Sequence, residues 1–338
     1  MMRGNRIRGK KMLYIFFHIN KCAGTTFRYH LEHNLKADEY ICIYEGRYFD
    51  VNEMAYKYFT PGKRREEIDA YLDSLSDVQK DKIKILCGHA VYYGIHRFFP
   101  GREVRYITFV RHHAAREVSM YNFSRMILED PSEHLAERDD IYRIHEFKKI
   151  RKNLTRGKKT FSFSEWLEND TECANFISKT LMREGFAISG ETPENVLKKF
   201  YFVGITENYH SDALFLYYLL GVKKFYPDKN ISKKYIGRAN ISKGEHDIIS
   251  RRNTDDMQLY EEALHFNRNF KRHTPSFICL VLLMRLKMFL IHAKTYFSGY
   301  RTPPQVAYDA SLALRGRIPL YARFIDTLKA GVSFLKER

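Results

Sequence analysis

Short apolar runs alternate with helical patterns along most of the chain. Five runs have the length and composition of buried strands, namely residues 12–18, 40–44, 82–87, 104–110 and 200–205. Apolar residues at helical spacing follow them, at residues 25–35, 63–80, 113–126, 208–220 and 255–270. Strands that alternate with helices of this length predict an α/β fold of three layers, in which helices flank a central parallel sheet. In such folds, ligands bind at the carboxyl ends of the strands.

The same pattern divides the chain into three parts. Residues 1–11 form a basic tail, residues 12–273 a single domain, and residues 274–338 a basic helical extension. Within the domain, residues 129–160 are strongly charged and are expected to form an insertion. Residues 63–80 are expected to form one exposed amphipathic helix, because their apolar side chains recur at helical spacing.

Composition and charge narrow the classes of partner. Hydrophobic residues make up 44% of the 338 residues, which argues against a disordered chain. Lys and Arg number 57 against 40 Asp and Glu, a net charge of +17, and this balance favours an anionic partner. The five cysteines form no CxxC pair, so a disulfide scaffold is excluded and a reducing compartment is favoured.

The apolar segments do not resemble secretory or membrane-spanning sequences. The apolar run at residues 12–17 is shorter than a secretory core of about 7–15 residues. The run at 277–291 is interrupted by Arg285 and Lys287, and charges near the bilayer centre are costly. We therefore expect a cytoplasmic protein whose 277–291 helix packs on the domain. The alternative is a basic interfacial helix over 276–301 that contacts an anionic membrane, making the protein peripheral.

The most specific local pattern is IFFHINKCAGTTF at residues 15–27. A buried strand leads through a short turn into a helix, and such a turn presents backbone N–H groups and a helix N-terminus to an anion. Lys21 adds a positive charge and the threonines add hydroxyl donors. The lysine precedes the glycine, so this is not a Walker A motif. The alternative interpretation is a capped helix after a core strand.

A second pattern, YITFVRHHAAREVSMY, spans residues 106–121. Arg111 ends a predicted strand, and Ser119 lies about two turns into the helix that follows. The two side chains could reach one phosphate, the guanidinium as a bidentate fork and the hydroxyl as a donor. Taken alone, an Arg and a Ser at this spacing would be a surface pair.

The two patterns together resemble the carbohydrate sulfotransferases that use 3′-phosphoadenosine-5′-phosphosulfate (PAPS), here without the membrane anchor of the Golgi-type enzymes. The resemblance implies a P-loop-like three-layer fold. It also implies that PAPS is the co-substrate, that the 5′-phosphosulfate is held by Lys21, Cys22, Ala23, Gly24, Thr25 and Thr26, and that the 3′-phosphate is held by Arg111 and Ser119. No metal is expected.

A third segment, LCGHAVYYGIHRF at residues 86–98, is similar to the uronyl 2-O-sulfotransferase branch. The resemblance implies that His89 is the catalytic base. Segments 202–209 and 253–264 also match the family pattern, so the resemblance covers residues 12–270 in order. The sequence departs from the family where Asn20 replaces a proline, where His112 and His113 replace Asp-Pro, and where Cys87 replaces a histidine.

Sulfuryl transfer resembles phosphoryl transfer, an in-line displacement in which the protein mainly positions groups and stabilises charge. A histidine is well suited as base near neutral pH. We therefore expect His89 to deprotonate the acceptor hydroxyl and Lys21 to stabilise the leaving group. His18 is interpreted as a satisfied core histidine, and His96, His112 and His113 remain as further candidates for the base.

The basic loop at 223–244 contributes a further candidate nucleotide ligand, Arg238, with a solvated lysine-rich loop as the alternative. The predicted function is therefore PAPS-dependent sulfation of a hydroxyl on a glycan or glycolipid. One alternative is a P-loop kinase-like phosphotransferase, for which no Walker A geometry is found. Another is a basic nucleic-acid-binding protein; no reader motif supports it, and no nucleic acid is expected as partner.

Overall fold

A computed structural model describes residues 12–129, 161–170, 172–226 and 233–297, with side chains up to residue 288. The predicted basic tail 1–11, nearly all of the predicted insertion 129–160 and residues 298–338 lie outside the described residues. The predicted domain boundaries therefore stay a prediction.

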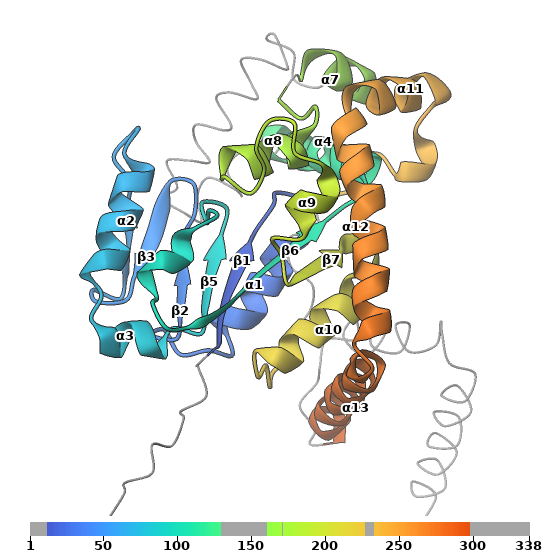
Figure 1. Cartoon of the computed structure of the whole chain (residues 1–338). Helices are drawn as coiled ribbons and strands as arrows, with labels where there is room; N and C mark the ends of the chain where they lie inside the picture. The colour runs from blue at the N-terminus through green and yellow to red at the C-terminus, as the bar shows by residue number, and fades with distance from the viewer. Residues whose placement is uncertain (1–11, 130–160, 171, 227–232, 298–338) are drawn as a thin grey trace, which may run out of the picture.

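The centre of the fold is a five-stranded parallel sheet (Figure 1). Its strands are β1 (Met12–Phe17), β2 (Tyr40–Cys42), β5 (Ile85–Gly88), β6 (Glu103–Val110) and β7 (Phe202–Ile205). Their order is β2-β5-β1-β6-β7, so the first strand of the chain lies in the middle. The five predicted strands and the α/β fold are confirmed.

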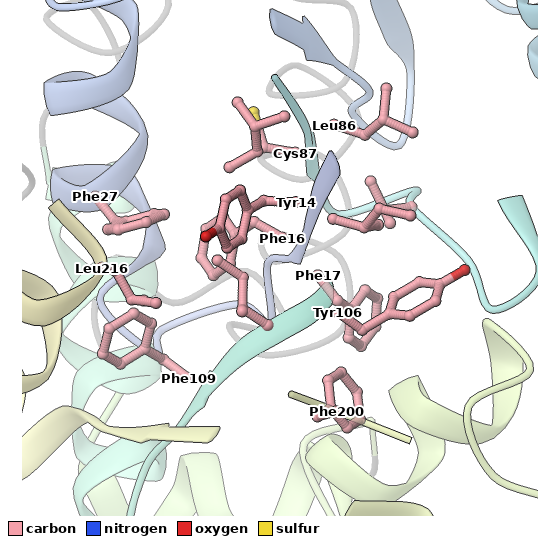
Figure 2. Packing of buried hydrophobic residues seen from close by; sticks show 14 of the residues in the cluster. Tyr14, Phe16, Phe17, Phe27, Leu86, Cys87, Tyr106, Phe109, Phe200 and Leu216 are labelled. Atoms are coloured by element: carbon pink, nitrogen blue, oxygen red, sulfur yellow. The ribbon is translucent and has the colours of Figure 1, made fainter. Parts of the chain in front are cut away.

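Both faces of the sheet are covered by aromatic side chains. On one face, Phe16 of β1 and Phe109 of β6 contact Phe27, at ring-centroid distances of 4.7 and 5.9 Å. On the other face, Phe17 and Tyr106 contact Phe186, at 4.6 and 5.4 Å. Figure 2 shows Phe27 and Phe109 on one side of β6 and Phe17 and Tyr106 on the other. Consecutive buried residues along β1 reflect this double cover, which is typical of parallel sheets.

Four of the predicted helices are confirmed in place. They are α1 (Gly24–Glu32), α4 (His113–Glu129), α10 (Tyr209–Leu219) and α12 (Thr254–His273). Between and after them lie α7 (Phe163–Asn169), α8 (Phe176–Arg183), α9 (Pro193–Leu197), α11 (Lys243–Arg252) and the 3-10 turns η1 (Ile95–Phe98), η2 (Thr206–Asn208) and η3 (Arg238–Asn240).

The expectation of one helix over residues 63–80 is wrong. The segment forms α2 (Arg64–Ser74) and α3 (Asp77–Lys82). Ser76 adopts an extended conformation and caps α3, accepting a hydrogen bond from the Gln79 backbone while the Gln79 side chain accepts one in return. This reciprocal capping box begins a new helix, and apolar spacing alone does not reveal it.

A small hairpin that the apolar pattern did not predict follows β2. Its strands, β3 (Arg47–Asp50) and β4 (Ala55–Tyr58), pair antiparallel. Most β4 residues are exposed, so the hairpin has little of the apolar signal that marks a buried strand.

The last described helix, α13 (Ser276–Phe297), lies against α10. Phe277, Val281 and Met284 are buried in the main core. Within the described part of the chain, no helix has the length and apolar character needed to cross a membrane.

Candidate active site

The predicted site residues gather where β1, β5 and β6 reach their carboxyl ends. The loop after β1 contains Lys21, β5 leads into His89, and β6 leads into Arg111. Hydrogen bonds connect the ends of these three strands. The His18 amide donates to the Gly88 carbonyl at 3.1 Å, and the Thr108 hydroxyl donates to the Phe17 carbonyl at 2.8 Å. Three segments far apart in sequence thus form one rigid edge.

The loop between β1 and α1, residues 18–23, has an unusual backbone. Lys21 and Ala23 have positive φ angles of 66° and 61°, which non-glycine residues adopt at a cost of about 1–3 kcal/mol each. Left-handed residues separated by one ordinary residue turn successive N–H groups toward a common point, and such concavities bind anions. Ala23 is also the residue that precedes α1, so the amides of the first helical turn point out of the same loop.

Cys22 takes part in this loop through internal hydrogen bonds, and its thiol donates to the Asn20 carbonyl at 3.7 Å. Its side chain is fully buried, and burial raises the pKa of the thiol to about 12. Its amide donates to the Ile19 carbonyl at 3.2 Å, which closes the turn. The Cys22 amide is therefore used within the turn, and the loop can offer an anion the Lys21 amine and the amides from Ala23 onward.

Lys21 and Arg111 meet across the loop. One Arg111 guanidinium nitrogen, Nη1, donates to the Lys21 carbonyl at 3.0 Å. The Nε of Arg111 is buried and has no hydrogen-bond partner among the described residues. The Lys21 amine lies 4.1 Å above the ring of Phe123 on α4. A buried guanidinium that keeps an unused donor beside a strained loop is suited to bind an anion.

Arg238 reaches the same edge from η3. Its Nη2 lies 3.2 Å from Nε2 of His112, while Nδ1 of His112 accepts the Ala114 amide at 3.2 Å. Burial, the largest cause, lowers the pKa of His112 to about 4, so the ring is neutral and has only one acceptor nitrogen. The ring can therefore accept a hydrogen bond either from the Ala114 amide or from Arg238, but not from both at once.

The predicted ligand Ser119 lies half-buried in α4, one turn before Asn122. The Asn122 side chain accepts the amides of Tyr235 and Ile236 and donates to the Ile236 carbonyl. These bonds fix the segment that leads into Arg238 against α4. Ser119, three residues before Asn122, lies on the face of α4 that this segment contacts.

His89 follows β5 and is held through its ring. Its Nδ1 lies 2.6 Å from the carbonyl oxygen of His18. A carbonyl can only accept, so Nδ1 carries the proton and Nε2 keeps its lone pair in the neutral ring. Burial, the largest cause, lowers the pKa of His89, and Arg28 and Arg183 act in the same direction. The ring is therefore neutral near pH 7, as a general base must be.

Two residues at this edge were not assigned to the site from sequence. His18, interpreted as a satisfied core histidine, is indeed buried, but its Nδ1 has no partner among the described residues. Glu207 in η2 accepts the His112 amide at 3.1 Å and the Tyr260 hydroxyl at 3.0 Å. Glu207 lies in the segment 202–209, and the similarity of this segment to the family pattern is the sequence signal that could have identified it.

Cys87 replaces a family histidine but does not enter the site. Its thiol is buried, 3.0 Å from the Sγ of Cys42, its partner on the neighbouring strand β2. Among the residues that the structure describes, no cluster of His, Cys, Asp and Glu could hold a metal ion.

A surface of tyrosine and arginine is formed after β2 and on the hairpin β3–β4 by Tyr44, Arg47, Tyr56 and Tyr58. The Arg47 guanidinium is 4.5 Å from the Tyr56 ring and 5.6 Å from the Tyr44 ring. The Ile43 amide donates to the Cys87 carbonyl at 2.7 Å, and the Ala90 amide donates to the Ile43 carbonyl at 3.2 Å. These bonds hold the start of this tyrosine–arginine surface next to the residues that flank His89.

Groups suited to bind an anion lie at the carboxyl edge of a parallel sheet, next to a histidine that is neutral near pH 7, and this arrangement is typical of a group-transfer enzyme with an anionic donor. The family model described as Sulfotransferase family matches residues 7–266, and the chain belongs to that family. Comparison with curated proteins gave no significant match. The family implies PAPS as donor and a separate acceptor substrate. The branch of the family and the acceptor are not resolved by this match.

Proposed function

We propose that the protein transfers a sulfuryl group from PAPS to a hydroxyl of a carbohydrate, either a glycan or a glycolipid. The observation that carries the proposal is the state of His89. Its proton is fixed on Nδ1 by the His18 carbonyl at 2.6 Å, which leaves Nε2 as a base at the edge that holds the donor-binding groups.

The donor supplies an activated sulfuryl group. The amides from Ala23 to Thr26, together with Lys21, are suited to hold its 5′-phosphosulfate, because the strained loop and the helix N-terminus concentrate positive potential there. Arg111, Arg238 and Ser119 are suited to hold its 3′-phosphate. The unused Nε of Arg111 supports this assignment.

In the proposed reaction, His89 takes the proton of the acceptor hydroxyl at Nε2 while the acceptor oxygen bonds to sulfur. The bond from sulfur to the bridging phosphate oxygen breaks in line with this attack. Lys21 stabilises the negative charge that develops on the bridging oxygen. The amine of Lys21 lies over Phe123, so this role requires a rotation of its flexible side chain.

A carbohydrate acceptor is supported by two features. The segment at 86–98 is similar to the uronyl 2-O-sulfotransferase branch around His89. The tyrosine–arginine surface lies beside this segment, with Tyr56 and Tyr58 exposed at 40% and 46%. Exposed aromatic rings with an arginine among them offer a flat surface and hydrogen-bond donors to a sugar chain.

The test has a donor arm and an acceptor arm. Thermal unfolding is measured with 3′,5′-ADP (PAP), ADP, ATP and AMP, because a ligand that binds only the native state raises the Tm. We expect PAP alone to do so; equal stabilisation by ATP would overturn the assignment of the donor. Transfer of labelled sulfate is then measured on a desulfated glycosaminoglycan, a neutral polysaccharide, a glycolipid and a phenol. Transfer to the phenol alone would overturn a carbohydrate acceptor.

A further inference from the structure

The ring of His18 fills the space between His89 and the beginning of α1. The His18 and His89 rings are stacked, with centroids 3.9 Å apart and planes inclined by 27°. On the α1 side, a Cβ at Gly24 would lie 1.9 Å from Cδ2 and 2.2 Å from Nε2 of His18. A side chain at position 24 would therefore push the ring out of this place, and glycine leaves room for it.

This ring is poorly explained as ordinary packing. His18 is only 6% exposed, and its Nδ1 is buried without a hydrogen-bond partner among the described residues. Burying an unpartnered polar atom is unfavourable, and a phenylalanine would fill similar space without that penalty. Phe16 and Phe17 show that aromatic residues are readily accommodated in the neighbouring core.

We propose that His18 is a positioning residue for the base of the transfer reaction. Its carbonyl fixes the proton of His89 on Nδ1, and its ring holds the His89 ring at the donor-binding loop. The inference rests on the proposed role of His89.

The stacking has an electrostatic consequence for the proton transfer. When His89 accepts the acceptor proton it becomes a cation, and a neutral aromatic face at this distance stabilises a cation. Burial keeps His18 neutral by lowering its pKa, with further lowering by His89, Arg28 and Lys21. The other charged groups that act on His89 are Glu45, Arg28 and Arg183. The His18 ring is thus the aromatic neighbour through which the proton affinity of His89 can be adjusted.

Two substitutions of His18 distinguish an effect of ring stacking on His89 from an effect of merely filling the space beside it. His18→Phe keeps an aromatic face, so we expect kcat within about threefold of wild type and an unchanged acidic limb of the kcat/KM profile against pH. His18→Leu fills part of the space without a ring. We expect it to lower kcat about tenfold or more and to move the acidic limb down by about half a pH unit. A Leu variant whose acidic limb stays at the wild-type pH would overturn the proposal.

Gly24→Ala displaces the ring without altering His18 itself. The three atoms nearest to the added Cβ all belong to the His18 ring, so His18→Ala removes these three contacts. We expect Gly24→Ala to reduce kcat in the wild-type background and to add little in the His18→Ala background. The two single variants and the double variant form a double-mutant cycle with the wild type. Additive effects of Gly24→Ala and His18→Ala on kcat would overturn the proposal. PAP-induced Tm shifts on all four proteins report donor binding separately from kcat.

His89→Asn distinguishes this inference from the function on which it rests. Retained sulfuryl transfer by His89→Asn would remove the proposed base, and the role of His18 with it. Loss of transfer in His89→Asn, combined with a wild-type profile for His18→Leu, would overturn the role of His18 alone.

Discussion

The loop between β1 and α1 and the tyrosine–arginine surface are built in different ways. The loop offers backbone groups, and its shape depends on positive φ angles at Lys21 and Ala23 and on the absence of a side chain at Gly24. The surface offers side chains, of which Tyr56 and Tyr58 are exposed, and none of its four residues has a positive φ angle. The first arrangement restricts which residues can occupy each position, whereas the second restricts the chemistry of the side chains alone.

This difference has a functional consequence. A strained, buried loop recognises a chemical group in one geometry, which suits a donor that all members of an enzyme family share. A surface of exposed rings can accommodate ligands of different shape, which suits acceptors that differ between members of an enzyme family. We therefore expect substitutions in the loop and on the surface to affect different kinetic constants.

We expect the largest loss of transfer rate from a substitution of His89. His89→Asn removes the proposed base, and loss of a general base typically costs about 10²–10⁴-fold in rate. PAP-induced stabilisation should remain, because His89 is not expected to bind the nucleotide. His96→Asn is the matched control, since His96 also lies near the strand ends and its Nδ1 bonds to the Tyr106 hydroxyl at 2.9 Å. Equal losses in the two variants would contradict the assignment of the base.

On the donor side, Arg111→Lys keeps the charge but loses the planar fork and the bond to the Lys21 carbonyl. Loss of charge-assisted hydrogen bonds of about 1.5–3 kcal/mol should weaken PAP binding about 10- to 100-fold. Titration calorimetry measures the Kd for PAP. Arg125→Lys on α4, whose partner is Glu129 at 3.1 Å, serves as control and should bind PAP normally. Unchanged PAP affinity in Arg111→Lys would remove Arg111 from the donor site.

On the acceptor side, the double variant Tyr44→Ala/Arg47→Ala should raise the KM for the carbohydrate about tenfold. The Kd for PAP should not change. Arg105→Ala is the control, because Arg105 also stacks on a tyrosine, 4.2 Å from the ring of Tyr201, but lies toward the amino end of β6. An effect of the double variant on PAP affinity would mean that the two sides are not separate.

The smallest effect concerns the pH dependence of stability. The pKa of His112 is lowered to about 4 in the folded protein and is near 6.5 when unfolded. The unfolded chain therefore binds an extra proton as the pH falls below 6.5, so stability falls from pH 6.5 toward pH 4. Because His112 is only partly buried, solvent screens most of this effect, and His112→Gln should flatten the decline by only about 1 kcal/mol, measured by urea unfolding at several pH values. An identical decline in both proteins would contradict the lowered pKa.

Much of the fold was predictable because buried parallel strands have a strong apolar signal. The loop at 18–23 was also predictable, because a strand, a lysine, a glycine and a helix in close succession restrict the backbone. The break at Ser76 depends on a capping bond, and the exposed hairpin has little apolar signal, so both escaped prediction. The environment of His18 depends on its contact with His89, 71 residues away, which no local pattern contains.

The central place of β1 in the sheet also affects how the chain folds. Tyr14 pairs with Ile85 and Met12 with Glu103, so the first strand acquires its two neighbours only after about a hundred residues are available. Contacts of such large sequence separation slow folding, and an apolar strand that waits for its partners is prone to aggregate. During synthesis, the segment Met12–Phe17 therefore leaves the ribosome long before it can be buried. A nascent chain that stalls before β6 would expose one edge of this strand.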